Sequence, residues 1–499
     1  MRTMQLVSTM VSAVALAALC AACGSDTKDA KPAVQPLSWT NCPAEMGTQV
    51  QCASVEVPLD RDKPDGDKIT VGLNRLPASD AAHRIGSLVI DPGGPGGAGT
   101  SVVAGESAHP GIIPAQLRSR FDLIGFDPRG IGTSKPLVQC DTELQAKLPD
   151  IYPTDQASFD ALVAANRALG QSCQRLTGPL LDHVDTINVA RDLDVVRQRL
   201  GDGPLNYLGL SYGTEIGFEY ARLFPGNSRA LVLDGALVHS LPPSAMHVYE
   251  TAAFEDTLHR FADWCHTATD CALGGDDANS VVRDLATQAR RAPLAAPGCV
   301  TSGQCKPTVG LGDLMQQIQD EMLFAPDLQP VSPGWPGLAK ALDQARHGDA
   351  SALSPAKPTP SDAAGLAVGC AEFRADFDTY AMLKSEQTLA ATLAPNTLGI
   401  GQSYSYLAQC QGWPGAFSNP PHTAVAKPTI RPLLVNATHD PSTSYGWAQL
   451  MATEIPNAVF LTRDGNGHTS SLLPGQTRDA IVDYLINGTL PAPGTVLPN

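Results

Sequence analysis

The sequence predicts an α/β fold in which helices flank a mostly parallel sheet and a large, mainly helical cap interrupts the sheet. Three observations lead to this prediction. Short, nearly continuous apolar runs, each ended by a polar or glycine-rich turn, recur in the first half of the chain, and such runs are typical of strands covered on both faces. Helix-like segments separate several of these runs. The strand pattern returns after residue 427, following a long alanine-rich stretch.

The composition allows a large globular core and excludes some classes of protein. The 499 residues are 43% hydrophobic and 17% charged. The formal net charge of −16 argues against a nucleic-acid-binding protein and against attachment to anionic lipid through basic patches, since both need clustered positive charge. By itself the acidity indicates only solubility.

The N-terminus has the pattern of an export signal. Residues 1–22 contain an early positive charge at Arg2 and an apolar run shorter than the ~20 residues that a membrane-spanning helix needs. The stretch AACGS resembles a bacterial lipobox, which makes Cys23 the candidate for lipidation, although Cys20 stands where that pattern prefers Leu. Residues 23–40 would form a polar tether. The protein is therefore expected outside the cytoplasm, either as a lipoprotein on the outer face of the cytoplasmic membrane or simply secreted.

The cysteines support export. Removing Cys20 with the signal and Cys23 to lipid leaves ten of the twelve, and an even number in an exported chain suggests disulfides. The sequence does not establish connectivity, but the cysteines fall into neighbouring couples: Cys42–Cys52, Cys140–Cys173, Cys265–Cys271, Cys299–Cys305 and Cys370–Cys410. No couple has Cys-x-x-Cys spacing, and neither His-x-x-x-His nor His-Glu-x-x-His occurs, so we expect no metal site.

The first part of the core is expected over residues 41–237. The stretch VEVPLDRDKPDGDKITVGLNRLPA predicts a hairpin at the edge of the sheet, with its turn at Pro-Asp-Gly. SLVID, FDLIGF, LNYLGL and ALVLD predict four further strands. TINVARDLDVVRQRLG has apolar residues at helical spacing and ends at Gly201, which predicts a helix.

The cap is expected over residues 238–427, between the sixth and seventh predicted strands. This segment contains helix-like patterns such as LGDLMQQIQDEML, loops rich in Ser and Pro, and six of the ten remaining cysteines. The core then resumes over residues 428–499. LLVNATHD and NAVFLTRDGNGH predict strands that end in polar loops, and TRDAIVDYLING predicts a closing helix. One sheet with an insertion explains this order better than two independent domains.

A serine lies between a predicted strand and a predicted helix. Ser211 is the centre of Gly209-Leu-Ser-Tyr-Gly213, the Gly-x-Ser-x-Gly pattern of a nucleophile elbow. Flanking glycines remove side chains that would clash in such a strained turn, and the following helix aims its N-terminal amides at the site. The alternative is an ordinary tight turn. The context favours Ser211 as a nucleophile.

A glycine loop follows the strand SLVID. Gly93-Gly-Pro-Gly-Gly97 is not a Walker loop, because no Gly-Lys-Ser/Thr follows it. It could be a plain flexible loop, but acyl transfer requires two backbone amides aimed at a tetrahedral oxyanion. Gly94 and Tyr212 are the candidate donors.

The candidates for the base and the acid follow later strands. His468 lies in the loop DGNGHTS after the last predicted long strand, and imidazole exchanges a proton near neutral pH without a large pKa shift. Asp440 follows the seventh predicted strand and lies between the nucleophile and the base in the chain, as an acid in this order of residues should. Asp234, at the end of the sixth predicted strand, is the rival. Asp464 is too close to His468 in sequence to be attractive.

These motifs together resemble the exported tripeptidyl aminopeptidases of actinobacteria, in the prolyl aminopeptidase clan (peptidase family S33) of α/β-hydrolases. The resemblance rests on segments that occur in order along the chain: DPGGPGGAG, FDLIGFDPRGIGTS, NYLGLSYGT, LDG, CQGWP, NATHDPSTSYGWA and GNGH. It implies an α/β-hydrolase fold, a C-terminal segment of the tripeptidyl aminopeptidase type over roughly residues 400–499, and a triad of Ser211, Asp440 and His468.

The resemblance also implies that acidic residues of the cap hold the ammonium of the substrate. Glu372, in VGCAEF, is the best match, although family members often have Asp there, and a surface glutamate beside a disulfide is the alternative. Burying an ammonium without a partner is costly, so a cap carboxylate is physically reasonable. Ser442 and Ser444 stand where relatives often have Thr and Pro. That departure concerns the shape of the substrate site and leaves the triad unchanged.

The sequence therefore predicts a serine hydrolase that needs no cofactor. The expected activity is release of short peptides, of the tripeptidyl type, from substrates with a free N-terminus. A carboxylesterase or lipase with the same triad is the alternative, and a catalytically silent envelope-binding protein is a remote one. Peptides are the expected partners, with contact to the membrane only through a lipid on Cys23.

Overall fold

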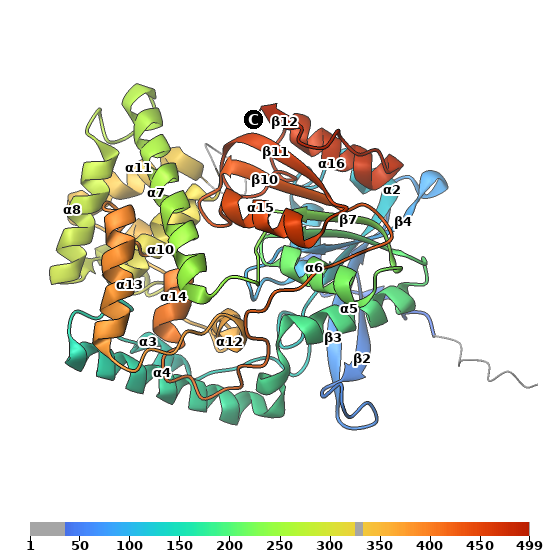
Figure 1. Ribbon diagram of the computed structural model, residues 1–499, viewed down its shortest axis with the longest axis horizontal. Coiled ribbons are helices and arrows are strands. Elements are labelled where there is room, and N and C mark those ends of the chain that lie inside the picture. Colours follow the sequence, from blue (N-terminus) through green and yellow to red (C-terminus); the bar gives the residue numbers. More distant parts are fainter. Residues whose placement is uncertain (1–34, 325–332, 499) are drawn as a thin grey trace, which may run out of the picture. The chain divides into compact units, whose positions relative to one another are not determined.

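The eight predicted strands and two short strands that were not predicted, Thr40–Asn41 and Val496–Pro498, form one ten-stranded sheet (Figure 1). The computed structural model describes residues 35–324 and 333–498. Its strand order is β1-β2-β3-β5-β4-β6-β7-β10-β11-β12. The strands are β1 Thr40–Asn41, β2 Gln51–Pro58, β3 Lys68–Leu76, β4 Gly86–Asp91, β5 Phe121–Phe126, β6 Leu205–Leu210, β7 Ser228–Asp234, β10 Leu433–His439, β11 Val459–Asn466 and β12 Val496–Pro498.

The sheet is parallel over most of its width. From β5 through β4, β6, β7, β10 and β11 to β12 every pairing is parallel, whereas β1, β2 and β3 add an antiparallel edge. The predicted hairpin is β2 and β3. Strands β4, β5 and β6 are buried along their whole length, which explains why they are continuous apolar runs rather than alternating ones.

Helices cover both faces of the sheet. In β4, Leu88 and Ile90 belong to one hydrophobic cluster and Val89 to another, because successive side chains of a strand point to opposite faces. The helices α5 Thr186–Leu200, α6 Gly213–Leu223 and α15 Tyr445–Glu454 pack on one face; α1 Gly99–Ala108, α2 Ala115–Arg120 and α16 Gln476–Asn487 pack on the other. The predicted amphipathic helix is α5, and Gly201 caps it in the left-handed conformation.

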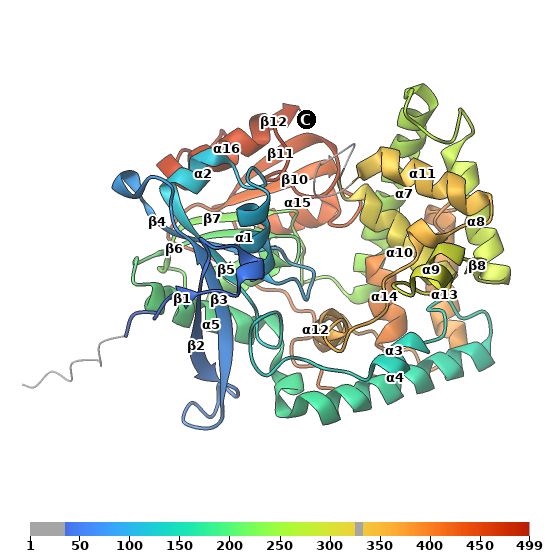
Figure 2. The ribbon, with the colours of Figure 1, turned by 180° about the vertical axis from the view of Figure 1, so that it is seen from behind.

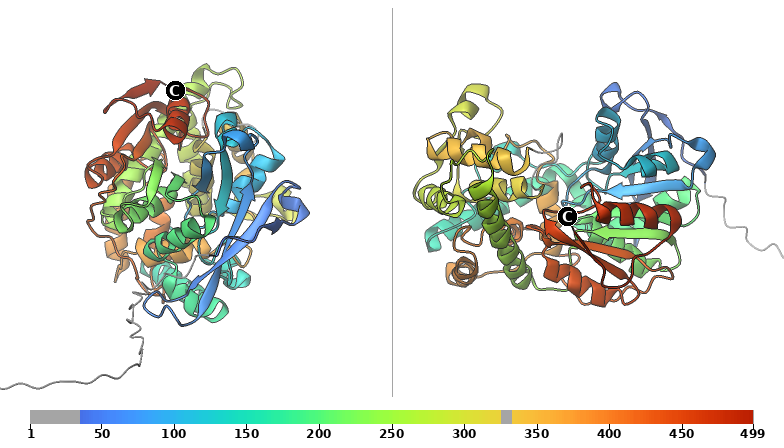
Figure 3. Two further views of the ribbon diagram at one scale, coloured as in Figure 1. Left: turned by 90° about the vertical axis from the view of Figure 1, so that its right-hand side faces the viewer. Right: turned by 90° about the horizontal axis from the view of Figure 1, so that it is seen from above.

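A mainly helical segment lies between β7 and β10 in the chain. Figures 2 and 3 show its helices gathered beside the sheet, and most of them share a hydrophobic cluster of their own. They are α7 Pro243–Thr267, α8 Ala278–Arg291, α9 Pro297–Ser302, α10 Leu311–Met322, α11 Gly334–Arg346, α12 Ala364–Glu372, α13 Tyr380–Leu393 and α14 Gln402–Gln409, with a short hairpin of β8 Leu294–Ala295 and β9 Thr308–Val309. We call this segment the cap.

Two helices of the first core segment extend along the cap. They are α3 Thr142–Ala146 and α4 Gln156–Thr177. In α4, Phe159 and Leu162 belong to the cap cluster, whereas Leu169 and Cys173 belong to a cluster on the sheet. This long amphipathic helix therefore packs against both parts of the molecule, which its position in the sequence did not indicate.

Five disulfides join the cysteines in the neighbouring couples: Cys42–Cys52, Cys140–Cys173, Cys265–Cys271, Cys299–Cys305 and Cys370–Cys410. Disulfides in this number are typical of proteins that fold outside the cytoplasm. Within residues 35–324 and 333–498, no helix has the length and apolar character of a membrane span. The predicted signal peptide, Cys23 and most of the tether lie outside the described residues.

The sheet brings distant parts of the chain to one edge. β6 ends at Leu210, β7 at Asp234, β10 at His439 and β11 at Asn466, and these four strands are parallel neighbours. Their carboxyl ends therefore meet along one side of the sheet, where open α/β sheets carry their reactive groups.

Candidate active site

Ser211 occupies a strained turn between β6 and α6. Its φ angle is +57°, one of only three positive values at non-glycine residues in the described part of the chain. The Ser211 amide donates to the backbone oxygen of Asp234 at 3.0 Å, and the Ser211 carbonyl accepts from the Thr214 amide at 2.8 Å. These bonds fix the turn on both sides and explain how a strained conformation persists.

The flanking glycines are required by close packing. A Cβ on Gly213 would lie 2.7 Å from the backbone oxygen of Asp91. A Cβ on Gly209 would lie 2.8 Å from the carbonyl carbon of Gly213. Neither position has room for a side chain, so the glycine spacing predicted from the sequence has a steric cause.

The glycine loop after β4 closes on the same turn. A Cβ on Gly93 would lie 2.7 Å from the Tyr212 nitrogen and 2.9 Å from Ser211 Cβ. Gly93 and Gly94 both have positive φ, at +85° and +114°. Within the described residues, neither the Gly94 amide nor the Tyr212 amide donates a hydrogen bond. The two candidate oxyanion donors thus lie in neighbouring turns with free N–H groups.

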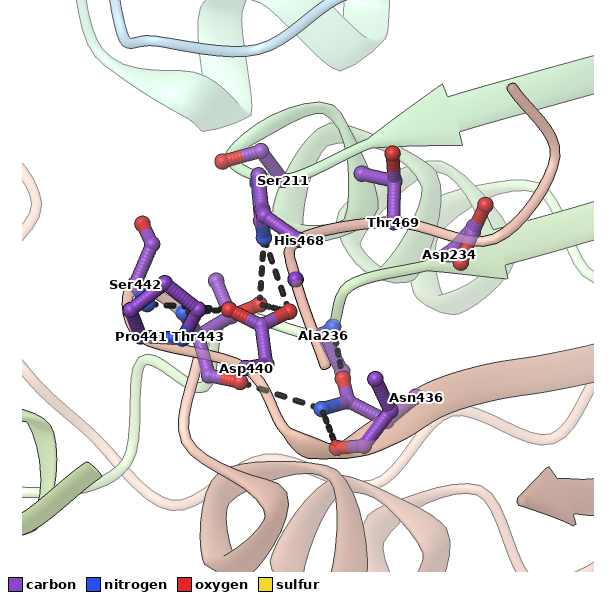
Figure 4. A network of polar contacts seen from close by, with 12 residues as sticks. Ser211, Asp234, Ala236, Asn436, Asp440, Pro441, Ser442, Thr443, His468 and Thr469 are labelled. Atoms are coloured by element: carbon purple, nitrogen blue, oxygen red, sulfur yellow. Dashed lines mark hydrogen bonds and ion pairs between the residues drawn. The ribbon is translucent and has the colours of Figure 1, made fainter. Parts of the chain in front are cut away.

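His468 and Asp440 form a buried pair (Figure 4). His468 Nδ1 lies 2.8 Å from Asp440 Oδ2, and the two side chains are 8% and 0% exposed. Asp440 Oδ1 accepts from the amides of Ser442 and Thr443, each at 2.9 Å, and Thr443 Oγ1 donates to Asp440 Oδ2 at 2.9 Å. The carboxylate is therefore held in one orientation by its own loop.

The contact with Asp440 determines the direction in which the pKa of His468 shifts. Burial lowers the pKa of His468, but the charge of Asp440 and the hydrogen bond to it outweigh burial, so this pKa lies above its ordinary value. With Nδ1 facing the carboxylate, the free position on the ring is Nε2. Nε2 is buried and has no hydrogen-bond partner in the described part of the chain.

Ser211 and His468 both lie beside the end of β7. Ser211 is bonded to the backbone of Asp234, and a Cβ on the next residue, Gly235, would lie 2.9 Å from His468 Cε1. Figure 4 shows both side chains at this strand end. No hydrogen bond joins Ser211 Oγ to the imidazole within the described residues. Such contacts are often long in unliganded enzymes and tighten when substrate binds.

Two residues that the sequence did not assign to this role hold the histidine loop. Arg463, buried within β11, donates from Nη1 to the Asn466 carbonyl at 2.8 Å and from Nη2 to the Gly467 carbonyl at 2.8 Å. Asp234 accepts from the amides of Ser470, at 3.0 and 2.8 Å, and Ser471, at 2.7 Å. In the sequence, Arg463 could have been noticed as a charged residue just after the apolar stretch of NAVFLTR.

The two rival acids lie elsewhere in the site. The Asp234 carboxylate binds backbone amides after His468, and no hydrogen bond joins it to the imidazole within the described residues. Burial raises the pKa of Asp234, although the amides of Ser470 and Ser471 oppose the rise. Asp464 is exposed and accepts from Thr438 Oγ1 at 3.2 Å. Of the three carboxylates, Asp440 is the one in contact with His468.

Two neighbouring cavities lie at this edge of the sheet, and the smaller one is lined by Ser211. The first, of about 30 Å³, is a narrow pocket lined by Gly94, Pro95, Ser211, Leu237, Pro243, Met246, Glu250, Phe373, Gln402, Ser403, Tyr406, Ser442, Thr443 and Trp447. The second, of about 840 Å³, shares Gly94, Pro95, Gln402 and Tyr406 with the first and extends along the cap. A wide chamber therefore leads to a narrow space at the serine.

Glu250, which no sequence motif marks, is the acidic residue in the narrow pocket. Its carboxylate accepts from Gln319 Nε2 at 2.7 Å, from the Gln402 amide at 2.9 Å and from the Ser403 amide at 2.6 Å. Burial raises the pKa of Glu250 despite these bonds. In the sequence, Glu250 could have been noticed as a carboxylate at helical spacing from the apolar residues Met246 and Phe254, which are buried on the same side of α7.

Glu372, the residue expected to hold an ammonium, does not line this pocket. It is fully buried, and its carboxylate accepts from the Thr186 amide at 2.5 Å, from Tyr212 Oη at 2.9 Å and from Asn419 Nδ2 at 3.2 Å. Burial raises the pKa of Glu372 to about 7. The C-terminal end of α12 turns this side chain toward the N-terminal ends of α5 and α6, and its contact with substrate stays a prediction.

Ser442 and Ser444, where relatives differ, are both buried in the acid loop, and Ser442 Oγ donates to Gln402 Oε1 at 2.7 Å. This contact links the acid loop to the cap at the narrow pocket. In the described part of the chain, no group of three or more His, Cys, Asp or Glu side chains is arranged to bind a metal.

Family models match two parts of the chain. Residues 86–295 match the model described as "alpha/beta hydrolase fold", and residues 396–497 match the model described as "TAP-like protein". The first match spans the strands that carry the glycine loop and Ser211. The second spans the strands that carry Asp440 and His468.

Similar curated proteins cover almost the whole chain. A serine protease, Hip1, from Mycobacterium tuberculosis is 31% identical over 92% of this chain and 90% of its own length. A carboxylesterase B from the same organism is also 31% identical, with the same coverage. A tripeptidyl aminopeptidase from Streptomyces lividans is 29% identical over 92% of this chain and 86% of its own length. With this similarity and the two model matches, the chain belongs to the tripeptidyl aminopeptidase family of α/β-hydrolases.

Proposed function

We propose that the protein is an exported serine aminopeptidase that releases short peptides, of the tripeptidyl type, from substrates with a free N-terminus. Ser211 is the nucleophile, His468 the general base and acid, and Asp440 the residue that orients the imidazole. The observation that carries this proposal is the 2.8 Å contact between His468 Nδ1 and Asp440 Oδ2, at the strand end where Ser211 is held at positive φ.

The reaction follows from the free Nε2 position. His468 Nε2 removes the proton of Ser211 Oγ as the oxygen attacks the substrate carbonyl, and Asp440 stabilises the imidazolium that results. The imidazolium then gives its proton to the leaving amine, and the C–N bond breaks. Water, deprotonated by His468 in turn, releases the acyl group from Ser211.

The amides of Gly94 and Tyr212 stabilise the tetrahedral oxyanion. Both N–H groups are free in the described structure, and the two turns that carry them are in contact. A preorganised donor of this kind contributes about 3–4 kcal/mol to lowering the barrier.

Glu250 replaces Glu372 as the proposed partner of the substrate ammonium. It lines the same narrow pocket as Ser211, whereas Glu372 does not. A buried ammonium needs a carboxylate because desolvation without a partner is costly. The ammonium would in turn favour the charged form of Glu250, whose pKa burial has raised.

The wide chamber has room for a substrate of several residues. Its volume of about 840 Å³ lies within the range of ligand-binding clefts, and it reaches the glycine loop at Gly94 and Pro95. This space supports peptides rather than single amino acids as substrates.

A fluorophosphonate probe and a peptide panel test the proposal. The probe should label Ser211, and labelling should disappear in Ser211→Ala. Among fluorogenic mono- to tripeptides, those with a free amine should be cleaved and their N-acetylated counterparts should not. Equal turnover of free and blocked peptides would remove the aminopeptidase assignment and leave a serine hydrolase.

A carboxylesterase is the second candidate, because one relative of equal identity bears that name. The narrow pocket is lined largely by apolar side chains, among them Leu237, Met246 and Trp447, which would also accept an acyl chain. Rapid turnover of short-chain esters with no cleavage of any free-amine peptide would favour this candidate.

The finer localisation is also part of the proposal. We place the protein on the outer face of the cytoplasmic membrane, anchored by a lipid on Cys23. The replacement Cys23→Ser should move the protein from the membrane fraction to the medium. An unchanged distribution would favour simple secretion.

A further inference from the structure

The side chain of Tyr212, the residue after the nucleophile, is held by the cap. Its hydroxyl donates to Glu372 Oε2 at 2.9 Å and also contacts Thr186 Oγ1. The ring of Phe373 meets the ring of Tyr212 edge to face, with centroids 6.5 Å apart. Glu372 and Phe373 form the C-terminal end of α12. The C-terminal end of this cap helix therefore contacts Tyr212, the residue that carries one candidate oxyanion amide.

The other end of α12 packs on the glycine loop. A Cβ on Gly96 would lie 3.0 Å from both the Cα and the nitrogen of Gly365, and a Cβ on Gly365 would overlap the backbone oxygen of Pro95. Pro95 and Gly96 directly follow Gly94, which carries the second candidate amide. The two loops that would form the oxyanion hole are thus both in contact with one nine-residue helix.

α12 is itself fixed in place. Besides Tyr212, Glu372 binds the Thr186 amide at the start of α5 and Asn419 Nδ2. Two residues earlier, Cys370 is joined to Cys410 at the end of α14. A helix is a rigid element of set length, with a rise of about 1.5 Å per residue. Contacts at its two ends therefore limit how far the glycine loop and the Ser211 turn can move relative to each other.

We propose that α12 is a brace that sets the spacing of the Gly94 and Tyr212 amides, and that Glu372 is a positioning residue acting through Tyr212. The proposal rests on the function proposed above. It gives the buried carboxylate of Glu372 a role in the reaction without any contact with substrate. A brace affects the transition state more than substrate binding, because the oxyanion forms only after attack.

A double-mutant cycle tests the Glu372 end of the brace. Glu372→Ala and Tyr212→Phe should each lower kcat about tenfold with KM within about twofold, a fraction of the ~10²–10³-fold loss for a missing oxyanion donor. The double variant should be no slower than the slower single variant, because both remove one contact. Glu372→Gln should recover most of the activity, since its amide can accept from Thr186 and donate to Tyr212 Oη.

Glu255→Ala is the matched control for a buried glutamate. In α7, Glu255 accepts from both the backbone and the side chains of Asn396 and Thr397, and none of these residues lines the pocket at Ser211. This variant should lose thermal stability but keep the wild-type kcat. A kcat loss equal to that of Glu372→Ala would mean that any damage to the cap slows the reaction, and would overturn the brace.

A second pair of variants, Gly365→Ala and its control Gly105→Ala, tests the end of α12 that contacts the glycine loop. Gly365→Ala should push the glycine loop away from Ser211 and lower kcat, because there is no room for the methyl group. In α1, a Cβ on Gly105 would meet only Ile112 Cδ1, at 3.7 Å, so Gly105→Ala should leave kcat unchanged. Equal kcat in Gly365→Ala and the wild type would overturn the brace at this end.

The remaining outcomes are distinguishable. A KM increase confined to free-amine peptides in Glu372→Ala, absent in Tyr212→Phe, would make Glu372 an ammonium partner and overturn the proposal. A kcat loss in the double variant equal to the combined losses of Glu372→Ala and Tyr212→Phe would also overturn the proposal. If Glu372→Ala does not fold, wild-type kcat in Tyr212→Phe overturns it. Failure of the wild type to react with a fluorophosphonate at Ser211 would instead refute the proposed function itself.

Discussion

The edge of the sheet and the cap build their parts of the site in different ways. At the sheet edge, Asp440 is held by amides two and three residues further along the chain. In the cap, Glu372 is held by groups 186 and 160 residues away. Asp440 is therefore fixed by its own short loop at a strand end, whereas Glu372 is fixed by contacts between residues far apart in the chain. Variants of the two regions should fail in different ways.

The largest expected effect is at the sheet edge. Ser211→Ala removes the nucleophile and should lower kcat by about 10⁴-fold or more, leaving only the residual catalysis of the other groups. The melting temperature, measured by circular dichroism, should stay close to that of the wild type. Peptidase activity that survives in this variant would assign the nucleophile to another residue.

The two aspartates at the sheet edge should differ from each other. Asp440→Asn should lower kcat by about 10⁴-fold, because the imidazole loses its charged acceptor, and should change stability little. Asp234→Ala leaves the Ser470 and Ser471 amides without their acceptor and should cost about 1–3 kcal/mol of unfolding free energy, with a smaller loss of kcat. Chemical denaturation and steady-state kinetics measure both. The reverse ranking would make Asp234 the catalytic acid.

Replacing the cap residue Glu250 should change which substrates are bound and should leave the chemical step unchanged. Glu250→Gln should raise KM for free-amine peptides about 10–100-fold, the loss of one charged hydrogen bond, and leave ester hydrolysis within about twofold. Glu255→Gln, a buried glutamate on the same helix, is the control. If esters and peptides lose activity equally, Glu250 supports the structure of the pocket and does not bind the amine.

The smallest effect is a shift of the pH profile. Because Asp440 raises the pKa of His468 above its ordinary 6.5, the imidazole stays protonated, and inactive as a base, to a higher pH. Activity should therefore fall as pH drops through a midpoint above 6.5. In Asp440→Asn the effect of burial dominates and the residual activity should have a lower midpoint. The pH dependence of kcat/KM measures both midpoints. An unchanged midpoint in Asp440→Asn would mean that the loss of activity at low pH is not caused by the His468–Asp440 pair.

The sequence predicted the sheet and the groups at its edge because both are encoded locally. Apolar runs marked the strands, and each candidate catalytic residue lies just after a strand: Ser211 after β6, Asp440 after β10 and His468 after β11. Glycines at 209 and 213 were visible because a turn without room for side chains tolerates little else. The neighbouring cysteines likewise indicated which couples the structure joins.

The cap was predicted as a segment but not as a set of contacts. Glu372 was expected to face substrate, yet it faces Tyr212 and Thr186, and Glu250 lines the pocket instead. The direction in which a helical side chain points depends on which neighbours the helix packs against. That information is spread over contacts between residues far apart in the chain, and α4, shared between the cap and the sheet, shows the same limit.

The sequence alone determined the class of fold, the order of the strands along the chain and the three residue types at their ends, because each follows from composition and spacing within about ten residues. Only the tertiary structure decided which aspartate touches His468, which glutamate reaches the pocket and that α12 contacts both oxyanion loops. Those choices depend on how separate elements pack against one another, and packing is a property of the folded surface as a whole.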